Sequence, residues 1–433
     1  MYNSTRLIIL KRLTNSIIIL LSAGVIGSLL LLVVYALPVE PMRDNVARGT
    51  QVYNSEGNFP ELAAGYKSTK LDNDTDSTML ANAIYPVSDI VKDAFSVPMI
   101  GYKSRNDRIS SLLDYSNRVK GATYVTTYPR YWHGYLTILK PLLLFFDFSD
   151  IRVFNMNLQF MLVSLSLILL FKANTQSLPA FIALIVVWNP TTISLSFQNS
   201  SCFYITIIAL LYILFKNKAL KINNIKLPYF FLLLGIVTVY FDFLTYPLVT
   251  LAIPLTLLLN ISLKTLLENI KAIFLNSIFW VIGYIGMWVE KWLIASIVLK
   301  QNIMLDGINQ FLLRSSKELE GNSFSLWECI YSQISVLLKW PYLVFFSGLL
   351  IFIIIYYYKR LNISTPSQLA FTNISNILLP YIILCLYPFI WYCIASNHCY
   401  SNPKFTYRLL GITVFASISG ILKYLNSLNR CKR

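Results

Sequence analysis

Long apolar stretches, separated by short polar connectors, dominate the chain. The first runs from Ser16 to Leu37 and would extend about 33 Å as a helix, which matches a hydrocarbon core of roughly 30 Å. Basic residues precede it, as in a signal peptide, but its length and the stretches that follow favour an uncleaved membrane anchor. Further spans are predicted at 153–172, 178–195, 201–215, 228–245, 247–262, 272–297, 340–357, 376–395 and 408–426. The pattern predicts an all-α polytopic membrane protein with about ten transmembrane helices.

Polar residues concentrate in one region directly after the first span. Residues 38–151 form the predicted large extramembrane loop, and the part from Pro38 to Arg130 holds 11 of the chain's 20 acidic residues. Within this loop Trp132 to Phe146 is apolar but short, and it carries Lys140, so we expect an interfacial or re-entrant helix there. The expected organisation is a first helix in residues 1–37, the loop in 38–151, and a transmembrane bundle in 152–433 with a short outer loop at 300–339.

Composition and charge support a membrane location. The chain is 56% hydrophobic with only 13% charged residues, which excludes a soluble globular domain. The formal net charge is +16, and the predicted cytoplasmic segments hold sixteen basic residues against the single acid Glu268. Because basic residues stay on the cytoplasmic side of short loops, we expect both termini in the cytoplasm. The excess of basic over acidic residues then reflects the orientation of the chain in the membrane and its contact with anionic lipid head groups, and no nucleic-acid partner is expected. The basic residues are Arg6, Lys11, Arg12, Lys172, Lys216, Lys218, Lys221, Lys226, Lys264, Lys271, Lys359, Arg360, Lys423, Arg430, Lys432 and Arg433.

Several common signatures are absent from the sequence. It contains no P-loop, no dinucleotide-binding fingerprint and no HExxH helix. Its six cysteines form no CxxC pair and no Cys/His metal spacing. ATP-driven transport and zinc proteolysis therefore lack their usual motifs.

The stretch LDNDTDSTML lies in the outer loop and places Asp72, Asp74 and Asp76 within five consecutive residues. Two interpretations stand beside each other. In one, the aspartates form a solvated turn, and Asp74 or Thr75 caps a helix that follows. In the other, one carboxylate is a general base and another holds a sugar hydroxyl or a divalent cation.

Cationic and histidine side chains are predicted near the same membrane face. Lys291 lies in the apolar stretch MWVEKWL, and His398 is followed by Lys404 and Arg408. Together these four could hold a lipid phosphate and stabilise the negative charge it gains as a leaving group. Structural alternatives exist: Lys291 could snorkel or pair with Glu290, and Arg408 could anchor a span.

Two further polar residues are expected at the outer face. His133 stands in the aromatic run YPRYWHGY, where it either belongs to an aromatic belt or contacts substrate. Asp242 stands at the outer end of a span in VYFDFLTYPLV, where it either caps the turn before Pro247 or binds a sugar hydroxyl.

Six stretches and the layout of the whole chain resemble one enzyme superfamily. The stretches are SEGNFPEL, LDNDTDSTML, YPRYWHGYLTILKPLLLFF, FDFLTYPL, MWVEKW and NHCYSNPKFTYR. With one long outer loop after the first span, they look like the C-type (GT-C) glycosyltransferases, and more closely a bacterial branch associated with surface polysaccharides. The resemblance implies a bacterial cytoplasmic membrane enzyme that uses a polyprenyl-phosphate sugar, such as an undecaprenyl-phosphate sugar, and a surface glycan or lipid-linked acceptor.

The resemblance also implies roles for individual residues. The general base of an inverting displacement would be Asp72 or Asp76, with Glu56 as a further candidate. The remaining implied roles are donor phosphate binding by Lys291, His398, Lys404 and Arg408, substrate binding by Arg130, His133 and Asp242, and a divalent cation, whose requirement stays open, near Asp72 and Asp74. Asn402 stands where this branch is expected to have a second histidine.

Two other functions remain open at this stage. A flippase or transporter for lipid-linked glycans also has many spans, but charged residues across the membrane's depth and symmetric halves are typical of such proteins. An O-antigen polymerase would be expected to carry its largest outer loop later in the chain. The nearly uncharged middles of the spans and the position of the large loop favour the glycosyltransferase.

Overall fold

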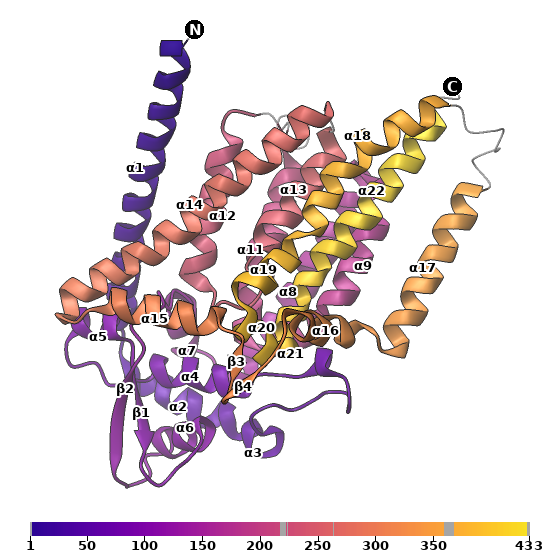
Figure 1. Ribbon diagram of the computed structural model, residues 1–433. Coiled ribbons are helices and arrows are strands. Elements are labelled where there is room, and N and C mark those ends of the chain that lie inside the picture. Colours follow the sequence, from indigo (N-terminus) through magenta and orange to yellow (C-terminus); the bar gives the residue numbers. More distant parts are fainter. Residues whose placement is uncertain (1, 217–221, 223, 263, 359–367, 431–433) are drawn as a thin grey trace.

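The structure is a computed structural model and describes residues 2–216, 222, 224–262, 264–358 and 368–430 (Figure 1). The predicted all-α architecture is confirmed, since the described residues are mostly helical. The helices of the bundle are α1 (Tyr2–Tyr35), α8 (Phe148–Ala173), α9 (Leu178–Trp188), α10 (Pro190–Leu195), α11 (Phe197–Phe215), α12 (Leu227–Phe241), α13 (Val249–Ser262), α14 (Leu266–Leu299), α17 (Trp340–Tyr358), α18 (Gln368–Cys385), α19 (Tyr387–Ile394) and α22 (Leu410–Arg430).

Seven helical segments of the described chain are long and apolar enough to cross a membrane. They are Leu10–Tyr35, Phe148–Ala173, Phe197–Phe215, Leu266–Leu299, Trp340–Tyr357, Ile374–Ile394 and Pro403–Leu428. Three shorter apolar helices, Thr175–Trp188, Leu227–Phe241 and Val249–Ser262, occupy the other predicted positions. The multi-pass character is therefore supported, and the count of ten crossings stays a prediction.

The polar segment after α1 folds into a separate layer at one end of the bundle, which we call the cap. It contains α2 (Val39–Gly49), α3 (Tyr53–Glu56), α4 (Asn73–Ala83), α5 (Ile90–Ser96), α6 (Arg108–Ser116) and α7 (Leu136–Leu143), with strands β1 (Pro98–Tyr102) and β2 (Thr123–Thr127). The strands pair antiparallel, with Pro98 opposite Thr127. Helix α7 is about 12 Å long and cannot cross a bilayer. Its Lys140 is buried and donates to the carbonyl of Ala83 at 2.8 Å, which ties α7 to α4.

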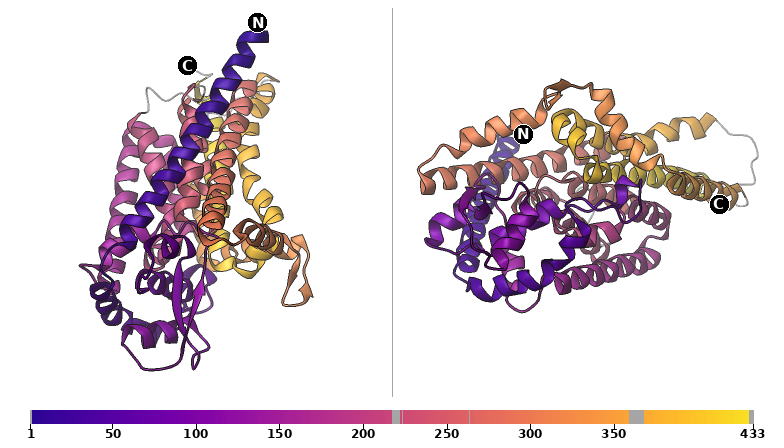
Figure 2. Two further views of the ribbon diagram at one scale, coloured as in Figure 1. Left: turned by 90° about the vertical axis from the view of Figure 1, so that its left-hand side faces the viewer. Right: turned by 90° about the horizontal axis from the view of Figure 1, so that it is seen from below.

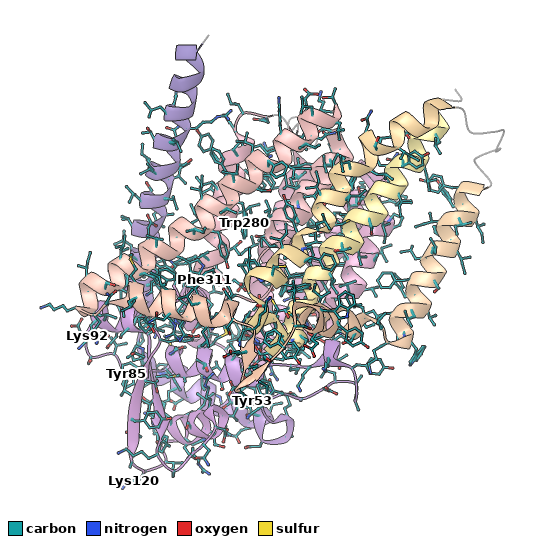
Figure 3. The ribbon with its side chains drawn as sticks, viewed as in Figure 1. Tyr53, Tyr85, Lys92, Lys120, Trp280 and Phe311 are labelled. Carbon is teal, nitrogen blue, oxygen red and sulfur yellow. The ribbon has the colours of Figure 1, made fainter. Side chains whose placement is uncertain are left out.

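The second polar segment lies at the same end of the bundle as the cap (Figure 1). It comprises α15 (Ile303–Ser315), α16 (Leu326–Leu337) and the short strands β3 (Glu318–Leu319) and β4 (Asn322–Ser323), beside α20 (Ser396–Ser401) and α21 (Pro403–Thr406). Helix α15 exposes Leu305, Phe311 and Leu312, of which Phe311 is labelled in Figure 3. One apolar exposed face on a short helix beside the cap is typical of a helix that lies in the membrane interface.

The start of α1 and the end of α22 lie at the end of the bundle opposite the cap (Figures 1 and 2). The predicted cytoplasmic location of both ends stays a prediction. Six of the basic residues used in that prediction, Lys218, Lys221, Lys359, Arg360, Lys432 and Arg433, lie outside the described residues.

Two glycines set the crossing of α12 and α14. A Cβ on Gly235 would meet the carbonyl oxygen of Trp280 at 2.2 Å, and one on Gly283 would meet that of Leu232 at 2.2 Å. Small residues let helix backbones approach closely within a membrane. Trp280, labelled in Figure 3, marks this crossing. The contact fixes α12, whose last residues lead directly to the candidate site.

Candidate functional site

A cleft of about 190 Å³ lies between the cap, α15 and the α20–α21 segment. Segments far apart in the sequence meet there. Its lining residues are Asp72, Thr75, Thr78, Arg108, Tyr128, Tyr131, Gln198, Phe243, Arg314, His398, Asn402 and Phe405. The wall combines one acidic, two guanidinium and several aromatic groups. We call Asp72, Arg108, Arg314 and His398 the cleft wall.

Asp72 is the acidic residue of the cleft and the N-cap of α4. Its Oδ1 accepts a hydrogen bond from the backbone N–H of Thr75 at 3.0 Å. The N-cap residue of the helix therefore lies two or three positions before the predicted N-cap at Asp74 or Thr75. Its Oδ2 lies 2.9 Å from Nζ of Lys404. That ammonium group also lies 3.7 Å from the ring centre of Phe59. The structure therefore brings together two of the predicted site residues, Asp72 and Lys404.

His398 and Arg314 form a second polar pair in the cleft. Nε2–H of His398 donates to the carbonyl oxygen of Leu244 at 2.7 Å, and its Nδ1 accepts from the guanidinium of Arg314 at 2.7 Å. Burial, together with the neighbouring Arg314, lowers the pKa of His398 to about 3. The histidine is therefore neutral near pH 7. Arg314 has no acidic partner among the residues that the structure describes, so most of its N–H groups remain available to a ligand.

Arg108 lines the cleft from α6. Its guanidinium lies 3.1 Å from Oδ2 of Asp74 and 3.2 Å from Oγ1 of Thr78. Burial raises the pKa of Asp74, and Arg108 opposes that shift. Asp74 thus holds a cation at the edge of the cleft.

The other two acids predicted as bases lie outside the lining of the cleft. Glu56 accepts from the guanidinium of Arg152 with both oxygens at 3.0 Å, and from the amide of Asn73 at 2.9 Å. Arg152 also donates to Oδ1 of Asn73 at 2.8 Å. This cluster joins the cap to the start of α8. Together with Asp76, we call these residues the buried frame, and a catalytic role for Glu56 stays a prediction.

Asp76 contacts the start of α11. Its carboxylate accepts from the backbone N–H groups of Phe197 at 3.0 Å and Gln198 at 3.2 Å, and the residue is only 1% exposed. Burial raises the pKa of Asp76 to about 7, against the opposing effects of Arg152 and the two N–H groups. Asp76 therefore links α4 to α11, and a role as the base stays a prediction.

Two of the four predicted phosphate ligands lie away from the cleft lining. Lys291 is fully buried and donates to the carbonyl of Phe95 at 3.2 Å. Arg408 is also fully buried and donates to the carbonyl of Trp188 at 2.9 Å. The structure does not bring these cations to the cleft with His398. Their positions agree with a role in joining backbone segments.

The three predicted substrate-binding residues are not among those that line the cleft. His133 donates from Nε2 to the carbonyl of Tyr128 at 2.8 Å, and burial followed by Lys291 lowers its pKa to about 3. Asp242 accepts from the backbone N–H of Thr245 at 2.8 Å, which agrees with the predicted turn cap. Arg130 pairs with Asp306 of α15 at 2.9 Å. Substrate contact by these residues stays a prediction.

The carboxylates proposed for a divalent cation already face other partners. Asp72 pairs with Lys404, and Asp74 pairs with Arg108. Within the described ranges, no group of three or more His, Cys, Asp or Glu side chains could hold a metal ion. These residues do not present the oxygen-rich set that Mg²⁺ or Ca²⁺ prefers.

The sequence did not point to several residues of the site. Arg108 and Arg314 line the cleft, and Arg152 organises the buried frame. Arg314 offered one weak signal, because it is a lone cation at the end of an amphipathic, largely apolar segment. Its contact with His398 joins positions 84 residues apart, which no local pattern reveals.

No protein-family profile, curated protein or solved structure matches this chain.

Proposed function

We propose that the chain is a glycosyltransferase that moves a sugar from a polyprenyl-phosphate donor to a surface glycan or lipid-linked acceptor. One observation carries the proposal: a single cleft at the end of an apolar helix bundle contains a carboxylate, two guanidinium groups and several aromatic rings. A donor of this kind needs cations for its phosphate at the membrane boundary and a base for the acceptor hydroxyl. Aromatic rings provide faces for the sugar or the prenyl chain.

Asp72 acts as the general base in this proposal. The acceptor oxygen forms a bond to the anomeric carbon, and its proton passes to the carboxylate of Asp72. The bond between the anomeric carbon and the phosphate oxygen breaks, and its electrons leave with the phosphate. This single displacement inverts the configuration.

Arg314 and Arg108 stabilise the departing phosphate. A guanidinium group offers parallel N–H donors that match two phosphate oxygens. His398 accepts one N–H of Arg314 and thereby orients the guanidinium, so it acts as a positioning residue. Lys404, paired with Asp72, adds positive charge close to the reacting atoms. The mechanism contains no metal step.

The proposed topology follows from the charge pattern. The start of α1 and the end of α22 lie at the end opposite the cap. Most basic residues of the connectors are predicted at that end, so we propose that it faces the cytoplasm. The cleft then faces the extracytoplasmic side of a bacterial cytoplasmic membrane. The donor arrives there already activated by its phosphate link.

An experiment in liposomes separates this function from its alternatives. Purified protein is reconstituted with polyprenyl-phosphate sugars labelled in the sugar, and both the release of polyprenyl phosphate and the movement of donor between leaflets are measured. The proposal expects release that depends on an added acceptor and is lost in Asp72→Asn. Asp150→Asn, which changes an exposed acid outside the cleft, should keep the activity.

Two outcomes would contradict the proposal. Movement of intact donor between leaflets, without release, would indicate a flippase. A polymerase would be indicated if the protein released a lipid diphosphate only from lipid-diphosphate oligosaccharides and used those same molecules as acceptors.

A further inference from the structure

A second pocket lies at the other end of the bundle, where the chain begins. It has a volume of about 370 Å³, within the range typical of small-molecule sites. The residues that line it come from α1, the segment before α12, and the first turns of α12 and α14: Arg12, Ile222, Asn224, Ile225, Pro228, Glu268, Lys271, Ala272, Leu275 and Asn276. We call it the terminal pocket. Figures 1 and 2 show that these parts of α1, α12 and α14 lie far from the cap.

Two cations of the terminal pocket lack an acidic partner. Arg12 and Lys271 form no ion pair with any carboxylate among the residues that the structure describes. The one acid in the lining, Glu268, accepts from the backbone N–H and hydroxyl of Thr265 in a capping box at the start of α14. Two cations at the cleft, Arg108 and Lys404, differ because each faces an aspartate, whereas Arg314 of the cleft wall resembles Arg12 and Lys271 in this respect. The terminal pocket therefore has positive charge available for an anion.

Asn276 supplies an independent sign of a ligand. Its side chain is 1% exposed, lines the pocket, and its Oδ1 has no hydrogen-bond partner in the described structure. A buried carbonyl oxygen without a donor is unfavourable, and such groups are rare in folded proteins. A hydroxyl of a bound molecule would satisfy it.

The other walls of the pocket are apolar. Ile222, Ile225, Pro228 and Leu275 line it beside the two cations. The ligand chemistry is thus amphipathic: an anionic group for Arg12 and Lys271, a hydroxyl for Asn276, and a hydrocarbon part. Basic pockets between membrane helices are known to bind anionic lipid head groups.

We propose that the terminal pocket binds an anionic glycerophospholipid whose head group carries a hydroxyl, as in phosphatidylglycerol. Arg12 and Lys271 hold the phosphate, Asn276 accepts a hydrogen bond from the head-group hydroxyl, and the acyl chains lie along the apolar wall. The site is separate from the cleft and does not depend on the proposed transferase activity. It ties α1 to the start of α14 at the end of the bundle that lacks a cap.

Native mass spectrometry of the full chain in detergent with defined lipids tests the charge requirement. Wild type should bind phosphatidylglycerol in preference to phosphatidylcholine. In the double variant Arg12→Gln with Lys271→Gln, the ratio of bound phosphatidylglycerol to bound phosphatidylcholine should fall by about tenfold or more. The matched control is Lys11→Gln with Lys264→Gln, which removes equal charge from exposed residues that do not line the pocket. An equal loss in the control, or no preference in wild type, would overturn the proposal.

A second comparison tests the hydroxyl. Asn276→Ala removes an Oδ1 that makes no hydrogen bond in the structure, so the fold should be retained. The variant should bind phosphatidylglycerol no better than phosphatidylmethanol, an anionic lipid without the hydroxyl, whereas wild type should prefer phosphatidylglycerol. Equal binding of both lipids by wild type would overturn the role of Asn276. Displacement of the lipid by glycerol phosphate at equal concentration would show that the ligand is a soluble phosphoester.

Discussion

The cleft wall and the buried frame use the same residue types in different surroundings. In the frame, the oxygens of Glu56 accept from Arg152 and Asn73, and those of Asp76 accept from backbone N–H groups. In the cleft wall, the oxygens of Asp72 also have partners, the Thr75 N–H and Lys404, but Asp72 and Arg314 line an open volume. Paired carboxylates and guanidinium groups therefore do not by themselves mark a catalytic site, and access to a cavity separates the two regions. Changes in the wall should reduce turnover, whereas changes in the frame should reduce stability.

Asp72→Asn should lower turnover by about 10²–10⁴-fold, because the amide cannot take the proton of the acceptor. Steady-state kinetics with the donor measures this, and thermal unfolding in detergent checks that the variant is folded despite the loss of the Lys404 ion pair. Wild-type turnover in folded Asp72→Asn would remove Asp72 as the base.

Arg152→Met should lower the free energy of unfolding by about 3 kcal/mol, because Glu56 and Asn73 lose their cationic partner. Chemical unfolding in detergent gives the value. Adding Glu56→Leu should restore part of the stability, since the unpaired acid is removed as well. If Arg152→Met keeps its stability but loses turnover, the frame belongs to the catalytic machinery.

Arg314→Ala should reduce turnover by roughly 10²-fold, as expected when a donor to the developing charge is removed. Stability should change little, because Arg314 is only half-buried and has no acidic partner among the described residues. His398→Gln should have a smaller effect of the same kind, since His398 only orients the guanidinium. Kinetics that match wild type in Arg314→Ala would place the phosphate elsewhere.

Asp76 should make stability depend on pH. Its pKa is about 7 in the folded chain, whereas an unfolded aspartate titrates at about 3.9. Between these values the folded state keeps a proton that the unfolded state has lost, so stability falls as pH rises, by at most about 1.4 kcal/mol per unit. Thermal unfolding from pH 5 to 8 should show this slope in wild type and a weaker one in Asp76→Asn. The same slope in both proteins would contradict the assignment to Asp76.

Lys291→Met should leave both stability and turnover nearly unchanged, because an apolar side chain of similar length replaces a buried cation held by one carbonyl. Glycosyl transfer and thermal unfolding measured on the same preparation test this. A more than tenfold loss of turnover would return Lys291 to the donor site that the sequence suggested.

Hydropathy predicted the bundle well because burial in a membrane requires long apolar helices. The acid-rich stretch and the motif around His398 each contain a residue that lines the cleft, Asp72 and His398. Lys291 and Arg408 were misleading guides to the cleft, since their carbonyl partners at Phe95 and Trp188 are set by tertiary packing. Arg314 was missed for the same reason, because its role depends on a contact between α15 and α20.

The most direct test is a cryo-electron microscopy structure of the full chain with bound polyprenyl phosphate, the proposed leaving group. The proposal predicts phosphate density within hydrogen-bonding distance of Arg314 and Arg108, beside Asp72 in the cleft. Phosphate held instead by Lys291 or Arg408, with the cleft empty, would contradict it.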